Sequence, residues 1–147
     1  MEIKINKEDI IKHNKHILAV SGGDFAVLNS SNLEFAIDSV NNETSPINQA
    51  TNFLYYGVIN HPFLNGNKRT SFEVSKGIMA SGALVLTAPQ SEIINFVTGS
   101  LAQGRASKDD VKIWLSEYSK PTDTRPEFNE ITSENIERDK KLLKKLD

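Results

Sequence analysis

Residue types that can carry chemistry gather in one short stretch, from His61 to Thr70. Proline disfavours helical geometry at the residue before it, so Pro62 should place His61 in a loop. Gly66 can open a tight turn, and the next helix is expected to begin near it. His61 would then face a helix N-terminus, where unpaired N–H groups and the helix dipole attract anions.

Two cations, Lys68 and Arg69, fall within the first turn of that expected helix. They oppose the helix dipole, a cost that is easier to understand if an anion normally sits there. The chemistry that fits is phosphoryl or nucleotidyl transfer, because a neutral His61 can take a proton from an attacking hydroxyl while backbone N–H groups and Arg69 hold a polyphosphate. Phe63 is expected to anchor the loop in the core. The sequence has no Gly-x-x-x-x-Gly-Lys-Ser/Thr pattern, so a P-loop is excluded.

The expected helices share apolar residues at helical spacing. They follow Asn6, follow the capping box Ser31–Glu34, cover Ile47–Asn60 and Gly66–Ser81, and follow Pro89 and Ser107. The helix over Ile47–Asn60 is apolar on nearly all sides, so we expect it to be central and buried. Ala83–Leu86 is the best strand candidate, and it is short. The sequence therefore predicts an all-α fold, a compact bundle of about six helices plus a charged C-terminal helix.

The composition changes after Lys120. From residue 121 to 147, 13 of 27 residues are charged, against 23 of the 120 before them. We divide the chain at this point into a domain over residues 1–120 and a charged C-terminal extension over residues 121–147. The extension is expected to be extended from Pro121 to Asn129 and then to form a short helix capped by Ser133. Its charged face is expected to be solvated or, alternatively, to bind a partner.

Composition and charge limit the classes of function. Lysine plus arginine number 17 and aspartate plus glutamate 19, for a net charge of −2, so direct nucleic-acid binding is not expected. The absence of cysteine excludes disulfides, thiolate zinc sites and a cysteine nucleophile. The start of the chain lacks the apolar region of a secretory signal, and the longest nearly apolar stretch, Gly77–Leu86, is too short to cross a bilayer. We therefore expect a cytoplasmic protein that does not enter the membrane.

The stretch around His61 resembles the signature of the Fic/Doc (Fido) superfamily, His-x-Phe-x-Asp/Glu-Gly/Ala-Asn-Gly/Lys-Arg. The residues that match it in register are His61, Phe63, Gly66, Asn67, Lys68 and Arg69. The resemblance covers residues from about 5 to 120, because Gly22-Gly23 and a Trp-containing late helix also fit the family's domain. It implies a Fido-type helical bundle.

The resemblance implies a role for each matched polar residue. His61 would be the general base, Arg69 would grip phosphate, and Asn67 with the backbone of Gly66 to Arg69 would line an anion hole. Lys68 separates the branches of the superfamily, because AMP-transferring Fic enzymes usually have glycine there and Doc-type toxins have lysine. Doc-type toxins bind the nucleoside triphosphate in reversed orientation and transfer its terminal phosphate. Lys68 would thus join His61 and Arg69 in catalysis.

Phe72 favours the same Doc (death-on-curing) branch, because it stands where many Fic enzymes have a second arginine. The resemblance then implies the toxin of a toxin–antitoxin pair, a kinase that moves a phosphate from a nucleoside triphosphate such as ATP to a serine or threonine hydroxyl of a protein. A translation elongation factor is the target class that the branch suggests. It also implies a Phd-like antitoxin whose disordered segment folds into the cleft. Two alternatives stay open: AMP transfer to a protein, and a non-catalytic module that binds a nucleotide or a protein.

Asn65 departs from the pattern, because the superfamily has an acidic residue there that helps to hold Mg²⁺. An amide oxygen can ligate a hard cation without adding charge, so we expect weak Mg²⁺ binding. Alternatively, Asn65 caps the following helix. His13 and His16 stand at i, i+3, but they lack a third ligand nearby and are not expected to bind a metal. Tyr55 and Tyr56 belong either to the core or to the cleft.

Overall fold

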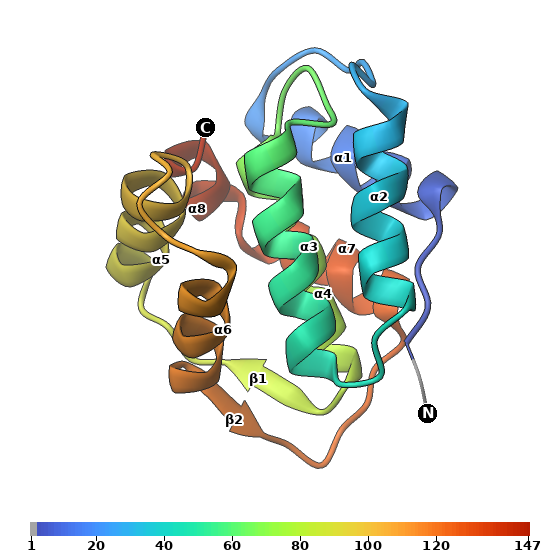
Figure 1. The fold of residues 1–147 in the computed structure, drawn as a ribbon. Coiled ribbons are helices and arrows are strands. Elements are labelled where there is room, and N and C mark those ends of the chain that lie inside the picture. The colour runs from blue at the N-terminus through green and yellow to red at the C-terminus, as the bar shows by residue number, and fades with distance from the viewer. Residues whose placement is uncertain (1–2) are drawn as a thin grey trace.

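The structure, a computed structural model, describes residues 3–147 and is predominantly helical (Figure 1). Its first helices are α1 (Lys7–Ser21), α2 (Ser30–Asn41), α3 (Pro46–Asn60) and α4 (Asn67–Ser81). They are followed by β1 (Leu84–Leu86), α5 (Gln90–Phe96) with a π-helical turn over Val97–Leu101, α6 (Lys108–Glu117), β2 (Ser119–Pro121), α7 (Phe128–Arg138) and α8 (Lys140–Lys145). The predicted all-α class is confirmed, with six α-helices before the charged C-terminal pair.

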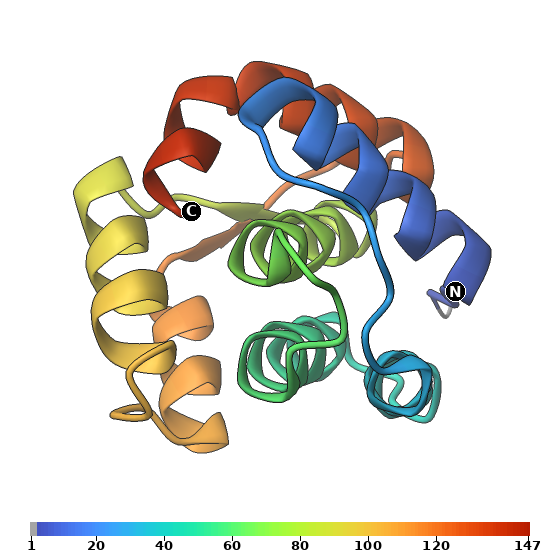
Figure 2. The ribbon, with the colours of Figure 1, turned by 90° about the horizontal axis from the view of Figure 1, so that it is seen from above.

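Helix α4 lies at the centre of the molecule, between α3 on one side and α1 with α7 on the other (Figure 2). Ten of its 15 residues are buried, all between Arg69 and Met79. The sequence predicted α3 as the buried central helix. Eight of its 15 residues are buried, but α4, with ten, is the more enclosed helix and takes the central place. A side chain at Gly57 on α3 would collide with Ser71 on α4, so the glycine allows these two helices to pack closely.

Side-chain caps fix where several helices begin. Asn6 caps α1 and Ser107 caps α6 in a reciprocal capping box, both as predicted. The predicted cap of α2 at Ser31 is wrong. Asn29 accepts the N–H of Asn32 at 2.9 Å instead, and so starts the helix two residues before the expected position.

A two-stranded antiparallel sheet joins β1 to β2, with Leu84 opposite Pro121 and Leu86 opposite Ser119. The strand candidate is confirmed over the three residues of β1. Its partner was not predicted, because the short polar segment Ser119–Pro121 carries no alternating pattern. The pairing leads the chain from α6 back past α4 towards α7 (Figure 1).

The C-terminal helices pack on the bundle, α7 against α1 and α4, and α8 against α1. Their apolar residues are buried: Phe128, Ile136, Leu142, Leu143 and Leu146. The predicted helix cap at Ser133 is wrong, because Glu127 accepts the N–H groups of Asn129 and Glu130, at 2.8 and 3.0 Å, and starts α7 at Phe128. The division of the chain at residue 120 stays a prediction. Within residues 3–147, no helix combines the length and apolar character needed to cross a membrane.

Candidate functional site

His61 directly follows α3 and takes a left-handed backbone conformation, with φ 46° and ψ 62°. This conformation is uncommon outside glycine, and it turns the chain sharply out of the helix. His61 therefore lies outside the helix, as predicted, and it is exposed. The next residue is held by the loop before α2, because the Pro62 carbonyl accepts the N–H groups of Leu28 and Asn29 at 2.9 and 3.1 Å.

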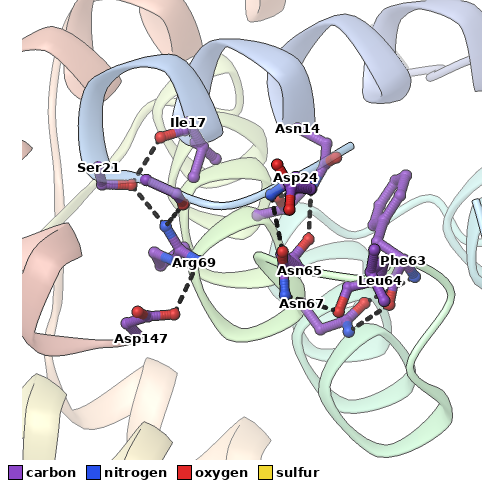
Figure 3. A network of polar contacts seen from close by, with 12 residues as sticks. Asn14, Ile17, Ser21, Asp24, Phe63, Leu64, Asn65, Asn67, Arg69 and Asp147 are labelled. Carbon is purple, nitrogen blue, oxygen red and sulfur yellow. Dashed lines mark hydrogen bonds and ion pairs between the residues drawn. The ribbon is translucent and has the colours of Figure 1, made fainter. Parts of the chain in front are cut away.

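Asn67 closes the loop that leads into α4. Its Oδ1 accepts the Phe63 N–H at 2.9 Å and its Nδ2 donates to the Phe63 carbonyl at 2.8 Å (Figure 3). The Phe63 side chain is 1% exposed, which confirms the predicted anchor. Because the Asn67 side-chain amide is used inside the loop, its backbone N–H is the group left for the predicted anion hole.

Gly66 is the residue from which α4 starts. Its φ of 80° and ψ of 20° lie in the left-handed region, where glycine carries no steric cost. No side chain caps this helix, so the alternative role of Asn65 as a cap is wrong. The N–H groups of the first helical turn have no partner within a helix, and an uncapped start leaves them available to a ligand.

The start of α4 opens into a cavity of about 210 Å³. It is lined by Leu64 and the predicted site residues, His61, Asn65, Gly66, Asn67, Lys68 and Arg69, together with Leu146 and Asp147 from the C-terminal end. All of the residues selected from the sequence thus meet around one cavity. Their roles in binding and catalysis remain predictions.

Arg69 is the most enclosed charged group of the site, at 1% exposure. Its Nη1 donates to Ser21 Oγ at 2.7 Å and to the Gly22 carbonyl at 2.8 Å, while its Nη2 pairs with Asp147 Oδ1 at 2.9 Å (Figure 3). Burial lowers the pKa of Arg69, and the nearby Asp147 carboxylate counteracts that shift. An anion that reaches Arg69 therefore meets a guanidinium already paired with a carboxylate.

The side chain of Asn65 is turned towards the loop after α1. Its Oδ1 accepts the Asp24 N–H at 2.8 Å, and its Nδ2 donates to the Leu64 carbonyl at 3.0 Å (Figure 3). One lone pair of the oxygen stays free. Residues 3–147 hold no group of three or more histidine, cysteine, aspartate or glutamate side chains that could bind a metal ion. The residues that line the cavity offer Mg²⁺ the neutral oxygen of Asn65 and the carboxylate of Asp147, which is paired with Arg69. The other ligands would be oxygens of a bound triphosphate.

The two other histidines connect α1 to α7. His13 Nε2 lies 2.8 Å from Asn129 Oδ1, and His16 Nε2 lies 2.6 Å from Glu137 Oε2. Burial lowers the pKa of His13, although its hydrogen bond to Asn129 acts in the opposite direction. Both histidines have hydrogen-bond partners on α7. Tyr55 and Tyr56 pack against the core and do not line the cavity, so the first of their two alternatives holds.

Two residues that contact the site, Asp147 and Asn14, were not predicted from the sequence. Asp147 reaches Arg69 across 78 positions of sequence. Asn14 lies inside α1 and donates to the Asn65 carbonyl at 3.1 Å. Both contacts are long-range, and no local spacing indicates them. The one available signal was Asn14 itself, a polar residue on the buried face of α1. Sequence alone does not distinguish such a buried asparagine from a solvent-exposed one.

Comparison with known proteins gives one match. Residues 4–76 match the Fic/DOC family. The matched segment is just under half of the chain and includes α1 to α3, the loop of His61 and most of α4. It supports the resemblance to the Fic/Doc superfamily and leaves the branch open. Searches of curated proteins and of solved structures found no match.

Proposed function

We propose, from the match of residues 4–76 to the Fic/DOC family, that this chain is a Doc-type protein kinase which transfers the terminal phosphate of a nucleoside triphosphate to a serine or threonine hydroxyl. The observation that carries the proposal is the cavity at the start of α4. There an exposed imidazole, a helix start without a side-chain cap, and the side chains of Lys68 and Arg69 share one space of about 210 Å³. A base, anion-binding N–H groups and cationic side chains are groups that phosphoryl transfer uses, together with Mg²⁺.

In the proposed reaction, His61 takes the proton of the target hydroxyl as its oxygen attacks the γ-phosphorus. A bond forms between that oxygen and phosphorus, and the bond from phosphorus to the β–γ bridging oxygen breaks, so the nucleoside diphosphate leaves with the electron pair. The N–H groups from Gly66 to Arg69 bind the phosphate oxygens and stabilise the charge in the transition state. Lys68 supports the Doc-type orientation of the donor, because lysine at this position is typical of that branch.

Mg²⁺, when bound, would neutralise part of the triphosphate charge. The oxygen of Asn65 is the group of this loop that would contact the ion, and most ligands would come from the donor phosphates. The proposed partners are a protein target of the elongation-factor class and a Phd-like antitoxin that occupies the cleft.

A non-catalytic binding module is the second candidate, and two observations favour it. Asn65 replaces the acidic residue of the superfamily, and its oxygen accepts the Asp24 N–H. Asp147 already occupies the guanidinium of Arg69. A module of this kind would bind nucleotide without turnover.

The test determines which phosphate of ATP is transferred to the target protein. The purified protein and a purified translation elongation factor are incubated with ATP labelled either at the γ-phosphate or at the α-phosphate. The proposal expects label on the factor from γ-labelled ATP alone. Label from α-labelled ATP would show AMP transfer instead, and binding of ATP without either label on the factor would support the binding module.

A further inference from the structure

Asn14, on α1, is a fully buried polar residue directly behind the loop that starts α4. Its side chain is 0% exposed, and its Nδ2 donates to the Asn65 carbonyl at 3.1 Å and to Thr70 Oγ1 at 3.0 Å (Figure 3). Its Oδ1 is also buried, and among residues 3–147 this atom has no hydrogen-bond partner. A buried amide oxygen without a partner destabilises the fold. Simple space filling does not account for an asparagine at this position.

The neighbours of Asn14 fix the direction of its amide. The Asn65 carbonyl can only accept a hydrogen bond, so the nitrogen of Asn14 must face it. The reverse orientation would bring two oxygens together and would leave the nitrogen without an acceptor there. The unpartnered oxygen is therefore the consequence of holding this one carbonyl.

The held carbonyl determines where the next N–H points. In a trans peptide the C=O of one residue and the N–H of the following residue point in opposite directions, and the described chain contains no cis peptide bond. Asn14 keeps the Asn65 carbonyl on the α1 side. The Gly66 N–H therefore points to the opposite side, away from α1. That side faces the cavity, which Gly66 lines and Asn14 does not.

Gly66 itself would not keep this peptide in place, because glycine tolerates both orientations. The packing around it is nevertheless tight. A Cβ at Gly66 would lie 3.0 Å from Asn14 Nδ2 and 3.3 Å from Leu18 Cδ2. If the peptide rotated, the Asn65 carbonyl would point its negative end at the place where phosphate is expected to bind.

We propose that Asn14 is a positioning residue for anion binding, which holds the Asn65 carbonyl away from the cavity and directs the Gly66 N–H into it. This inference rests on the proposed function for the identity of the anion, a phosphate group of the donor. It adds a residue of α1, outside the His61 to Arg69 signature, to the machinery of the site.

The test compares two buried asparagines. Asn14→Leu removes the donor and keeps a similar volume. Asn52→Leu is the matched control, because Asn52 on α3 is also buried and donates to the Ser39 carbonyl at 2.8 Å, away from the cavity. Affinity for sodium tripolyphosphate is measured by calorimetry, and thermal unfolding of each variant shows that it is folded. We expect Asn14→Leu to weaken tripolyphosphate binding at least tenfold and Asn52→Leu to leave it within twofold of wild type.

A spectroscopic readout separates positioning from stability. In wild type, the amide proton of Gly66 should shift downfield when tripolyphosphate is added, and in Asn14→Leu this shift should be lost. If Asn14→Leu does not fold, Asn14→Ala removes the same donor and is read in the same way. Equal affinity in the Asn14 and Asn52 variants with an unchanged Gly66 shift would overturn the inference, as would failure of wild type to bind tripolyphosphate. An Asn14-dependent affinity without phosphate transfer would leave this inference standing and refute the proposed function alone.

Discussion

Asn65 places a neutral amide where the superfamily has a carboxylate, and this exchange lowers the negative charge available to a divalent cation. Aspartate at this position can still accept the Asp24 N–H that Asn65 accepts at 2.8 Å, but it lacks the amide that donates to the Leu64 carbonyl at 3.0 Å. The added charge should tighten Mg²⁺ binding. We predict that Asn65→Asp raises phosphate transfer at limiting Mg²⁺ by about tenfold, which corresponds to about 1.4 kcal/mol of barrier.

A Mg²⁺ titration of transfer by wild type and Asn65→Asp measures this effect. Asn48→Asp, on α3, adds the same charge outside the cavity and serves as the control. A slower Asn65→Asp enzyme would show that Asn65 is adapted to its role. The description of Asn65 as a weakened metal ligand would then be wrong.

The residues of the site differ in how well their positions can be predicted from the sequence. Pro62 and Gly66 act on the backbone of their immediate neighbours, so the loop and the start of α4 followed from local rules. The orientation of Asn67 did not, because its bonds to Phe63 depend on a loop shape that the whole segment creates. Asn14 lies 51 positions from the carbonyl that it holds. Rules based on residue spacing predict only local contacts, so they do not predict this one.

At the scale of elements, Glu73 is the point where α4 meets the junction of α7 and α8. Glu73 is fully buried, and neither of its oxygens accepts a hydrogen bond within the described residues. Burial, and then the neighbouring Asp139 carboxyl, raise the pKa of Glu73 well above its ordinary value. A protonated Glu73 can donate to Asp139, which also pairs with Lys76 Nζ at 2.8 Å. The neutral form is therefore the one that this buried position favours.

This raised pKa predicts how stability varies with pH. The contribution of Glu73 is complete below the pKa of glutamate in the unfolded chain, about 4.3, and is lost as pH rises towards the folded-state pKa. Glu73→Gln keeps a hydrogen-bond donor and does not titrate. Relative to wild type, its free energy of unfolding should rise with pH above about pH 5, by up to about 1.4 kcal/mol per pH unit.

Urea denaturation of both proteins between about pH 5 and about pH 8 checks this prediction. Glu134→Gln, at an exposed position of α7, is the control for the loss of one carboxylate. If the Glu73→Gln difference varied with pH no more than that of the control, Glu73 would not be the neutral group described above.

The first residue of a helix was predicted correctly from the sequence where the chain offers a single candidate cap. Asn6 and Ser107 each begin a helix as predicted. Ser31 and Ser133 do not, because Asn29 and Glu127 lie upstream and accept the N–H groups of the first turn before those serines can. The sequence offers more than one candidate cap near each of these helix starts, and the preference of residue types for caps does not choose between them.

At the scale of the whole molecule, α8 returns the chain to the start of α4. There Asp147, whose side chain is 70% exposed, pairs with the enclosed Arg69 at 2.9 Å. A phosphate group must share or displace this carboxylate. We predict that Asp147→Asn strengthens tripolyphosphate binding several-fold, because it removes the carboxylate that competes for Arg69, and that it lowers stability, because the buried guanidinium loses its charged partner.

Glu137→Gln is the control for net charge, since it removes one negative charge from an exposed carboxylate of α7 that pairs with His16. Calorimetry of both variants at low and high salt separates the local effect from the general one. Equal gains in the two variants would mean that Asp147 acts only through net charge. The C-terminal end would then have no specific part in the site.

The proposed role of His61, which lines this cavity, is that of the base in a phosphate transfer. It is tested most directly by transfer from γ-labelled ATP to a purified elongation factor, measured for wild type, His61→Ala and His16→Ala under equal conditions. His61 is exposed, so its removal should leave thermal unfolding nearly unchanged. The account predicts that His61→Ala loses about 10²-fold or more of the rate and that His16→Ala, which lies outside the cavity, keeps the rate of wild type. An active wild type whose rate is unaffected by His61→Ala would contradict it.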